Sequence, residues 1–272
     1  MIHGPALLFC PADRPDRYAK ALAAADSVIL DLEDGVGATG KDAARAALLA
    51  TPLDPGRVIV RINAASSPEH AQDIEAVRRT GYQTIMLPKA ESRAQLDALA
   101  ALGDWDVLAL VESALGILHV AEVAAAPNVV AVLWGAEDLI ASMHGRSSRY
   151  PDGRYRGVAL HARERTLLAA TAYGKQAVDA VYTNIGDLAG LAAEAEDAAA
   201  SGFTLKALIH PSHVAVVRGA FRPDEELLAW ARRVLAAARS GHGDGGAIQL
   251  DGQMIDAPLI RQAEAILASA GE

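Results

Sequence analysis

Eight short runs of apolar residues recur along the 272-residue chain, and they constrain its fold more than any other feature. Continuous runs rich in Val, Ile and Leu, without polar alternation, are typical of parallel strands that are covered on both faces. We therefore predict a buried strand at each of these positions. The runs lie at 6–9, 27–32, 58–62, 84–87, 107–111, 130–134, 177–182 and 207–210.

Segments with charged and apolar residues at helical spacing separate the runs, for example DRYAKALAAAD at 16–26 and SRAQLDALAAL at 92–102. Eight strands that alternate with helices predict an α/β protein with a (β/α)8 TIM barrel. The alternative is an open, doubly wound sheet. The number of strands favours the barrel.

Composition excludes several classes of function. The chain carries 25 Lys and Arg against 34 Asp and Glu, a net charge of −9, which argues against a nucleic acid partner. No apolar run reaches the length of about 18 residues that a membrane span requires, and MIHGPALLFC at the N-terminus lacks the regions of a secretory signal. A single cysteine, Cys10, fits a reducing compartment. We therefore expect a cytoplasmic protein with no membrane partner.

Two stretches suggest how the chain is divided. The longest connection between predicted elements runs from about 139 to 164 and contains GRSSRYPDGRYRG, and loops of this length are usually functional or mobile. RSGHGDGGAIQLDGQ at 239–253 contains five glycines and predicts a flexible hinge before a last helix, APLIRQAEAILASA. We expect a barrel domain with peripheral helices over 1–238 and a hinge with a C-terminal lid helix over 239–272.

Polar side chains follow the predicted strands, at the ends where the active sites of barrels lie. The run at 130–134, for example, is followed by Gly135 and Ala136 and then by two adjacent acids. We therefore expect one polar rim. Its candidates are Glu33 and Asp34 after the second run, Arg61 and Asn63 in and after the third, Lys89 after the fourth, Glu112 after the fifth, Glu137 and Asp138 after the sixth, and His210 in the eighth.

Glu112 and Asp138 are separated by about one βα unit, so their strands should be neighbours, roughly 5 Å apart. Two carboxylates at that distance must share a proton or a cation. Oxygen ligands favour a hard ion such as Mg²⁺, and the lack of a His and Cys cluster argues against zinc. Arg61 offers a planar fork for a substrate carboxylate.

Each of these side chains also has a purely structural alternative. An acid at the end of a strand can cap the next helix, and Arg61 can neutralise the acids around it. Lys89 can be a Schiff-base nucleophile or a charged structural lysine among acids. No nucleophile-elbow pattern supports a serine triad.

Nine stretches in order, covering nearly the whole chain, resemble citrate lyase β-subunit-like proteins of the HpcH/HpaI aldolase and malyl-CoA lyase superfamily. The resemblance depends on their number and order. They are FCPADRPDRYAKA (9–21), VILDLEDGV (28–36), VIVRIN (58–63), IMLPKAES (85–92), ALVESALGI (109–117), WGAEDL (134–139), AVDAVYTNIGDLAGL (177–191), GFTLKALIHPSHV (202–214) and DGQMIDAP (251–258).

The resemblance implies a barrel with a C-terminal helical extension, usually trimeric, and it assigns roles to residues. Glu112 and Asp138 look like the Mg²⁺ ligands, and Arg61 looks like the clamp on the keto acid. Asp256 looks like an aspartate that reaches the site from a neighbouring subunit. Without the resemblance, Asp256 would simply cap the last helix.

Further positions follow from the same resemblance. Glu33 and Asp34 look like groups that act on the metal site through water, with Gly135 and Ala136 beside the substrate. The N-terminal cations resemble positions that contact the phosphates and the adenine end of coenzyme A. They are Arg14, Arg17 and Lys20.

The sequence also departs from the family pattern. Ala64 replaces a glycine that many relatives carry after VRIN, and the GRSSRYPDGRYRG loop differs from theirs, which leaves the acyl-group preference open.

The activity that the resemblance implies is Mg²⁺-dependent, reversible carbon–carbon cleavage of a 3-hydroxyacyl-CoA thioester. Citramalyl-CoA, malyl-CoA and 3-hydroxy-3-methylglutaryl-CoA are the candidates, with acetyl-CoA and a keto acid as products. Three alternatives stay open. They are a citrate lyase β-subunit acting on an acyl-carrier-protein thioester, a Schiff-base aldolase using Lys89, and a non-catalytic protein that binds keto acid and CoA.

Overall fold

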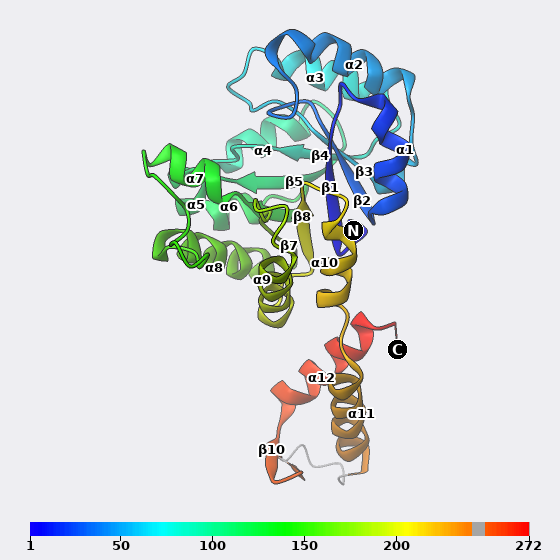
Figure 1. Cartoon of the computed structure of the whole chain (residues 1–272), viewed down its shortest axis with the longest axis vertical. Coiled ribbons are helices and arrows are strands. Elements are labelled where there is room, and N and C mark those ends of the chain that lie inside the picture. Colours follow the sequence, from blue (N-terminus) through cyan, green and yellow to red (C-terminus); the bar gives the residue numbers. More distant parts are fainter. Residues whose placement is uncertain (241–247, 272) are drawn as a thin grey trace. The chain divides into compact units, whose positions relative to one another are not determined.

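A computed structural model describes residues 1–240 and 248–271, and it confirms the closed (β/α)8 barrel (Figure 1). Its eight strands are parallel and follow one another in sequence order, and β1 pairs with β8 to close the sheet, so the open sheet is excluded. The strands are β1 (Ala6–Pro11), β2 (Ser27–Asp31), β3 (Val58–Arg61), β4 (Thr84–Leu87), β5 (Asp106–Val111), β6 (Val129–Trp134), β7 (Gln176–Asp179) and β8 (Leu205–Leu208).

Every predicted run overlaps its strand, and the largest differences are at β7 and β8. β7 ends at Asp179, before the predicted limit at 182. The next residue is bonded to a side chain, since the Ala180 carbonyl accepts a hydrogen bond from the Lys206 ammonium at 2.8 Å. β8 spans Leu205–Leu208, so His210 lies beyond the strand.

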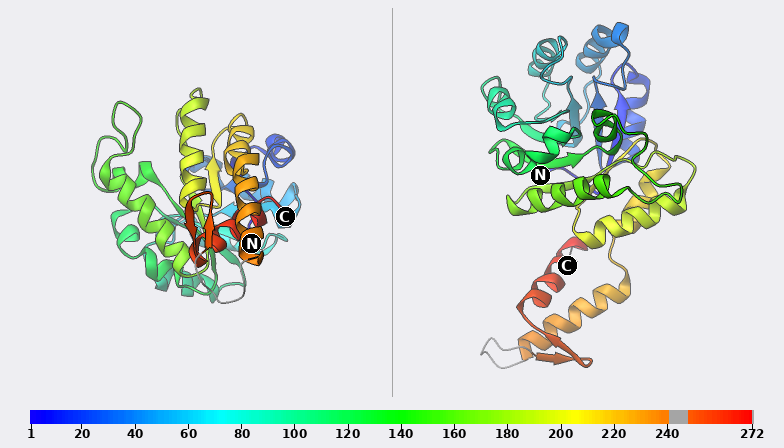
Figure 2. Two further views of the ribbon diagram at one scale, coloured as in Figure 1. Left: turned by 90° about the horizontal axis from the view of Figure 1, so that it is seen from below. Right: turned by 90° about the vertical axis from the view of Figure 1, so that its left-hand side faces the viewer.

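The helices between the strands lie on the outside of the barrel (Figures 1 and 2). Apart from two 3-10 turns (Ala38–Gly40 and Pro55–Arg57), the helices up to the end of the barrel unit are α1 (Pro15–Ala24), α2 (Lys41–Ala50), α3 (His70–Arg78), α4 (Arg93–Ala100), α5 (Ala114–Leu118), α6 (Val120–Ala124), α7 (Ala136–Ser142), α8 (Gly157–Ala172), α9 (Leu188–Ser201) and α10 (His213–Phe221). The predicted connection 139–164 is shorter in the structure, because α7 and α8 extend into it from both sides.

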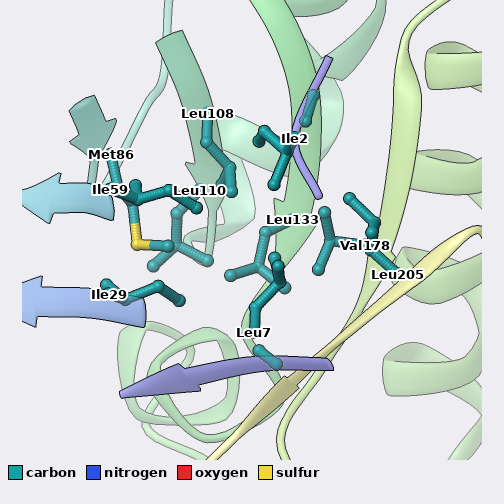
Figure 3. Close-up of a cluster of buried hydrophobic side chains, with 12 residues drawn as sticks. Ile2, Leu7, Ile29, Ile59, Met86, Leu108, Leu110, Leu133, Val178 and Leu205 are labelled. Carbon is teal, nitrogen blue, oxygen red and sulfur yellow. The ribbon is translucent and has the colours of Figure 1, made fainter. Parts of the chain in front are cut away.

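The barrel interior is a packed apolar core and not a channel. Figure 3 shows side chains from successive strands pointing toward one another at its centre, which is how small barrels fill their interior. The buried members are Ile2, Leu7, Ile29, Ile59, Met86, Leu108, Leu110, Ala131, Leu133, Val178, Leu205 and Ala207.

The chain divides into two compact units, Met1–Arg218 and Gly219–Glu272, so the division falls before the expected boundary at 238. The second unit contains α11 (Glu225–Ser240), the antiparallel pair β9 (Ile248–Leu250) and β10 (Gln253–Ile255), and α12 (Ala257–Ser269). α11 belongs with α12 because the two bury a common core of Ala231, Val234, Ile255 and Ala263.

Part of the expected glycine-rich hinge, at 241–247, lies outside the described residues. The part that is described forms the β9–β10 hairpin instead of a flexible linker. Its turn residues, Asp251 and Gly252, have φ values of 52° and 81°, the left-handed conformation that Asp-Gly supplies in two-residue hairpin turns. Among the described residues, no helix is long and apolar enough to cross a membrane.

Leu108→Ala should lower the free energy of unfolding by about 2–5 kcal/mol, because it leaves a cavity at the centre of the barrel. Leu118→Ala is the matched control, since that side chain is 63% exposed, and its effect should stay within about 0.5 kcal/mol. Urea unfolding measures both. Equal losses for the two variants would contradict a packed barrel centre.

Candidate active site

A cavity of about 410 Å³ opens at the carboxyl ends of the barrel strands. One part of its wall is polar and the other is apolar. The polar side chains include Asp31, Asp34, Arg61, Glu112, Glu137 and Asp138. The apolar ones include Phe9, Leu110, Leu133, Val181, Ala207 and Ile209. The polar rim that the sequence predicts therefore exists, and it lies beside an apolar surface.

Glu112 and Asp138 face the same cavity from neighbouring parallel strands, β5 and β6. Glu112 directly follows β5, and Asp138 lies in the first turn of α7, which follows β6. The ammonium of Lys89 lies 3.9 Å from Glu112 Oε1 and 4.0 Å from Asp138 Oδ1. The two carboxylates therefore surround one cationic position, as the spacing of their strands predicts.

Gly135 is the residue that lets Glu112 sit there. A Cβ atom at position 135 would lie 2.8 Å from Glu112 Cβ and 2.9 Å from Glu112 Oε2, closer than side chains normally approach. Gly135 and Ala136 both line the cavity. The absence of a side chain at 135 is thus a packing requirement of the carboxylate pair.

The pKa of the Glu112 carboxyl is raised to about 8, chiefly by burial and then by the nearby charges of Asp138 and Glu33, against the opposing charges of Lys89 and Arg61. Glu112 is 4% exposed. A carboxylate so poorly compensated takes up a proton or a cation, which is the condition for a metal ligand.

Lys89 is held as a cation by Glu33. Its Nζ donates to Glu33 Oε1 at 2.6 Å. Burial lowers the pKa of Lys89, but the hydrogen bond and charge of Glu33, with Glu112, raise it more, so the net pKa is raised. A Schiff-base lysine needs a lowered pKa to react as the free amine, and this environment does the opposite. Lys89 therefore matches the structural lysine better than the nucleophile.

Arg61 is oriented by Asp31, a residue that the sequence analysis did not single out. Arg61 Nε and Nη2 donate to the two Asp31 carboxylate oxygens at 2.7 and 2.5 Å. Burial lowers the pKa of Arg61, but the bonds and charge of Asp31, together with the charges of Glu33 and Glu112, raise it more, so the net pKa is raised. The guanidinium also lies over the Phe9 ring, 4.9 Å from its centroid. The Nε and Nη2 edge of the guanidinium is thus bonded to Asp31 and does not face a substrate.

Asp31 could have been suspected from the alignment of the strands. It ends an otherwise apolar strand, and it is the direct register partner of Arg61 on β3. Its carboxylate also accepts from the backbone N–H groups of Glu33 and Gly35, both at 2.8 Å. A Cβ on Gly35 would lie 2.4 Å from Asp31 Oδ2, so the DLEDG turn requires glycine at that position.

The two acids after β2 lie in different surroundings. Glu33 is buried, with Oε2 2.9 Å from Arg61 Nη1, an ion pair without the geometry of a hydrogen bond. Burial raises the pKa of Glu33, and Arg61 and Lys89 oppose that shift. Asp34 is exposed and lines the cavity. Glu33 therefore joins the acids around Lys89 directly, and Asp34 faces solvent.

The remaining predicted residues lie apart from this cluster. Arg14, Arg17 and Lys20 are exposed at and within the first helix, and Arg14 forms an ion pair with Asp16 at 3.0 Å. Asp256 belongs to the C-terminal unit, where its side chain caps α12 by accepting from the Leu259 N–H. The capping role that the sequence alone suggests for Asp256 is present.

The donors at this cavity fit Mg²⁺. Glu112 and Asp138 supply carboxylate oxygens from its lining. Within residues 1–240 and 248–271, no three His, Cys, Asp or Glu side chains cluster closely enough to hold a metal ion by themselves. Mg²⁺ commonly takes one or two protein carboxylates and completes its shell with water and substrate oxygens, so a pair is sufficient.

Comparison with known proteins shows the family to which the chain belongs. The sequence profile of the HpcH/HpaI aldolase/citrate lyase family matches residues 6–211. A citrate lyase subunit beta-like protein of Mycobacterium tuberculosis is 57% identical over 269 residues, covering 99% of this chain and 96% of the relative. The human mitochondrial citramalyl-CoA lyase is 33% identical, covering 95% of this chain and 83% of its own length.

The barrel is also close to solved structures. A crystal structure of protein CitE from M. tuberculosis, in complex with magnesium, acetoacetate and coenzyme A, superposes with a TM-score of 0.93. That protein is 57% identical, and the match covers 99% of both chains.

Glu112 should make the metal-free protein less stable as the pH rises. Its folded-state pKa of about 8 exceeds the ordinary value of 4.5, so the folded state keeps a proton that the unfolded state releases in between. Unfolding free energies in EDTA should fall by roughly 3–5 kcal/mol more between pH 5 and 9 for the wild type than for Glu112→Gln. Parallel pH curves for the two proteins would contradict the raised pKa.

Asp31→Asn should lower the free energy of unfolding by about 3–5 kcal/mol, because it leaves the buried Arg61 guanidinium without its charged partner. Asp16→Asn is the control, since it breaks the exposed pair with Arg14, and its denaturant midpoint should match the wild type. Chemical unfolding measures both. A midpoint of Asp31→Asn equal to that of the control would show that Arg61 does not depend on Asp31.

Proposed function

The chain belongs to the HpcH/HpaI aldolase/citrate lyase family, and from that premise we propose that it cleaves 3-hydroxyacyl-CoA thioesters into acetyl-CoA and a keto acid. It is a metal-dependent, aldolase-type carbon–carbon lyase with Mg²⁺ as its cofactor. The observation that carries the proposal is the Glu112–Asp138 pair, which faces the same cavity as Arg61 and its apolar wall.

Four polar groups of the cavity have a role in this reaction, those of Glu112, Asp138, Arg61 and Asp31. Glu112 and Asp138 hold Mg²⁺, which supplies Lewis-acid stabilisation of negative charge on the acid fragment. Arg61 binds the carboxylate of that fragment with the N–H groups that Asp31 leaves free, and so aligns the bond that breaks. Because Asp31 fixes the plane of the guanidinium, the substrate carboxylate meets a preorganised fork.

The protons and electrons then follow a simple course. The 3-hydroxyl group loses its proton to solvent, and its oxygen becomes the carbonyl of the keto acid as the carbon–carbon bond breaks. The electron pair of that bond passes to the thioester fragment as an enolate. Asp256 donates a proton to the enolate carbon and yields acetyl-CoA; in the reverse direction it removes that proton. Asp256 belongs to the C-terminal unit, and its delivery from a neighbouring subunit of a homotrimer is part of the proposal that follows from the family resemblance.

Coenzyme A binds by its charged end to the exposed cations Arg14, Arg17 and Lys20. They lie at and within α1, which begins directly after the carboxyl end of β1 and therefore at the same end of the barrel as the cavity. These cations are exposed to solvent, so pairing with phosphates removes little of their hydration. They therefore suit a long anionic ligand that stays partly solvated.

The apolar wall favours substrates whose acid fragment carries a methyl group. Phe9, Leu133 and Val181 are among the side chains that would surround it. Citramalyl-CoA and 3-hydroxy-3-methylglutaryl-CoA have such a group, and malyl-CoA has hydrogen there. One methyl is worth about 1–3 kcal/mol in a pocket, so we expect the first two to be cleaved about 10-fold or more faster than malyl-CoA at low substrate concentration.

The central experiment combines a thioester panel with Asp256→Asn. Asparagine caps helices as well as aspartate does, so the variant keeps α12 and loses only the proton donor. We expect wild-type cleavage that EDTA abolishes, and a loss of about 10²–10⁴-fold in kcat for Asp256→Asn. Asp251→Asn, in the β9–β10 turn of the same unit, is the matched control and should keep full activity.

The alternatives give different results in the same assay. Wild-type activity in Asp256→Asn would leave Asp256 as a helix cap only. Cleavage restricted to carrier-protein thioesters would identify a citrate lyase β-subunit. Protein that binds Mg²⁺ and acetyl-CoA but cleaves no panel member would be a sensor, and borohydride trapping at Lys89 would establish a Schiff-base aldolase.

A further inference from the structure

The connection between α7 and α8, residues 143–156, is an ordered hairpin. Arg149 and Tyr155 form an antiparallel bridge. The Tyr150 N–H donates to the Arg154 carbonyl and the Arg156 N–H donates to the Ser148 carbonyl, both at 2.8 Å. This stretch contains the loop whose sequence departs from the family pattern, and the reaction proposed above assigns it no role.

The hairpin is anchored to the outside of the barrel wall by Arg149 and Tyr155. The Arg149 guanidinium lies 3.7 Å from the centroid of the Tyr155 ring, and its Nη2 pairs with Glu194 Oε2 of α9 at 2.7 Å. Tyr155 contacts the edge of Trp134 on β6, with centroids 5.1 Å apart. Trp134 is itself fixed, because its Nε1 donates to the buried Asp179 at 2.9 Å.

The other end of this chain of contacts is the first turn of α7. Ser148 is 2% exposed, and its hydroxyl donates to Glu137 Oε1 at 2.7 Å. Glu137 directly precedes Asp138, one of the two carboxylates of the proposed metal site. A buried hydroxyl on an anchored hairpin is therefore bonded to the residue next to Asp138.

Asp138 has little else to hold it. Its only ion pair among the described residues is the 4.0 Å contact with Lys89, and within that part of the chain no hydrogen bond to its carboxylate occurs. α7 has only 7 residues, and its N-cap, Gly135, offers no side-chain cap. The direction of the Asp138 side chain thus depends on how the first turn of α7 is held from outside.

We propose that Ser148 is a positioning residue for the metal site, and that the anchored hairpin 143–156 sets Asp138 against Glu112 through the Ser148–Glu137 hydrogen bond. The inference rests on the proposed function only in taking Glu112 and Asp138 as the Mg²⁺ ligands. It predicts that breaking a hydrogen bond outside the metal site weakens metal binding, as loss of partners behind metal ligands commonly does by 10–100-fold.

The test is Mg²⁺ binding to the full-length metal-free protein by isothermal titration calorimetry, without substrate. Ser148→Ala should raise the Kd for Mg²⁺ about 10-fold or more. Ser147→Ala is the matched control, because the neighbouring hydroxyl bonds only within the hairpin, to the Arg149 backbone, and its Kd should equal that of the wild type. Far-ultraviolet circular dichroism checks that both variants are folded.

A double-mutant cycle identifies the route. If Ser148 acts through Glu137, adding Ser148→Ala to Glu137→Ala should change the Kd no further, whereas independent effects would add. Additive effects on the Kd would overturn the proposed route through Glu137. If Ser147→Ala and Ser148→Ala weakened Mg²⁺ binding equally, the positioning role of Ser148 would be wrong, because any loosening of the hairpin would have the same effect.

Asp138→Asn separates this inference from the proposed function. If Asp138→Asn abolishes Mg²⁺ binding and Ser148→Ala leaves it unchanged, the positioning role is wrong and the metal site stands. If Asp138→Asn binds Mg²⁺ as the wild type does, the ligand assignment itself is wrong.

Discussion

The site depends on an excess of buried negative charge at the carboxyl end of the barrel. Four carboxylates, those of Asp31, Glu33, Glu112 and Asp138, gather around two cations, Arg61 and Lys89. Arg61 is paired with Asp31 and Lys89 Nζ with Glu33 at hydrogen-bond distance. Glu112 and Asp138 are left with cation contacts near 4 Å, besides the hydrogen bond that Glu112 Oε1 accepts from the Lys89 backbone N–H at 3.1 Å. The surplus falls on these two residues, and a divalent cation is the partner that balances it.

The barrel produces this arrangement through strand register and local backbone. Asp31 meets Arg61 because they are register partners on β2 and β3, and Glu112 approaches the start of α7 because β5 and β6 pair as far as Val111 and Trp134. Positions 35 and 135 must in addition be glycine, because a Cβ atom there would clash with Asp31 and Glu112 respectively. Charge, register and two glycines therefore act as one constraint.

The fold and the polar rim were predictable from the sequence because each depends on a local pattern of residues. The hydrogen bonds and ion pairs within the rim were not predictable in this way. An apolar run identifies a strand. The residue that follows it lies at the carboxyl end of the barrel, whichever strands are adjacent to it. That Asp31 holds Arg61, or that Lys89 binds Glu33, depends on which side chains meet across strands far apart in sequence. The β9–β10 hairpin did have a local signal, Asp251-Gly252, but the surrounding glycines suggested a hinge instead.

A second ionic cluster, on the outer side of the barrel, has a different balance of charges. There Arg149, Arg163 and Lys206 face Glu194, Asp179 and Asp197, so cations and acids are equal in number. Burial alone would raise the pKa of Asp179, yet Lys206 and Arg163 lower it to about 2, whereas the pKa of Glu112 rises to about 8. A balanced cluster needs nothing further and serves as a rigid anchor. The inner cluster has two more acids than cations, and this surplus is the charge that the proposed metal ion would balance.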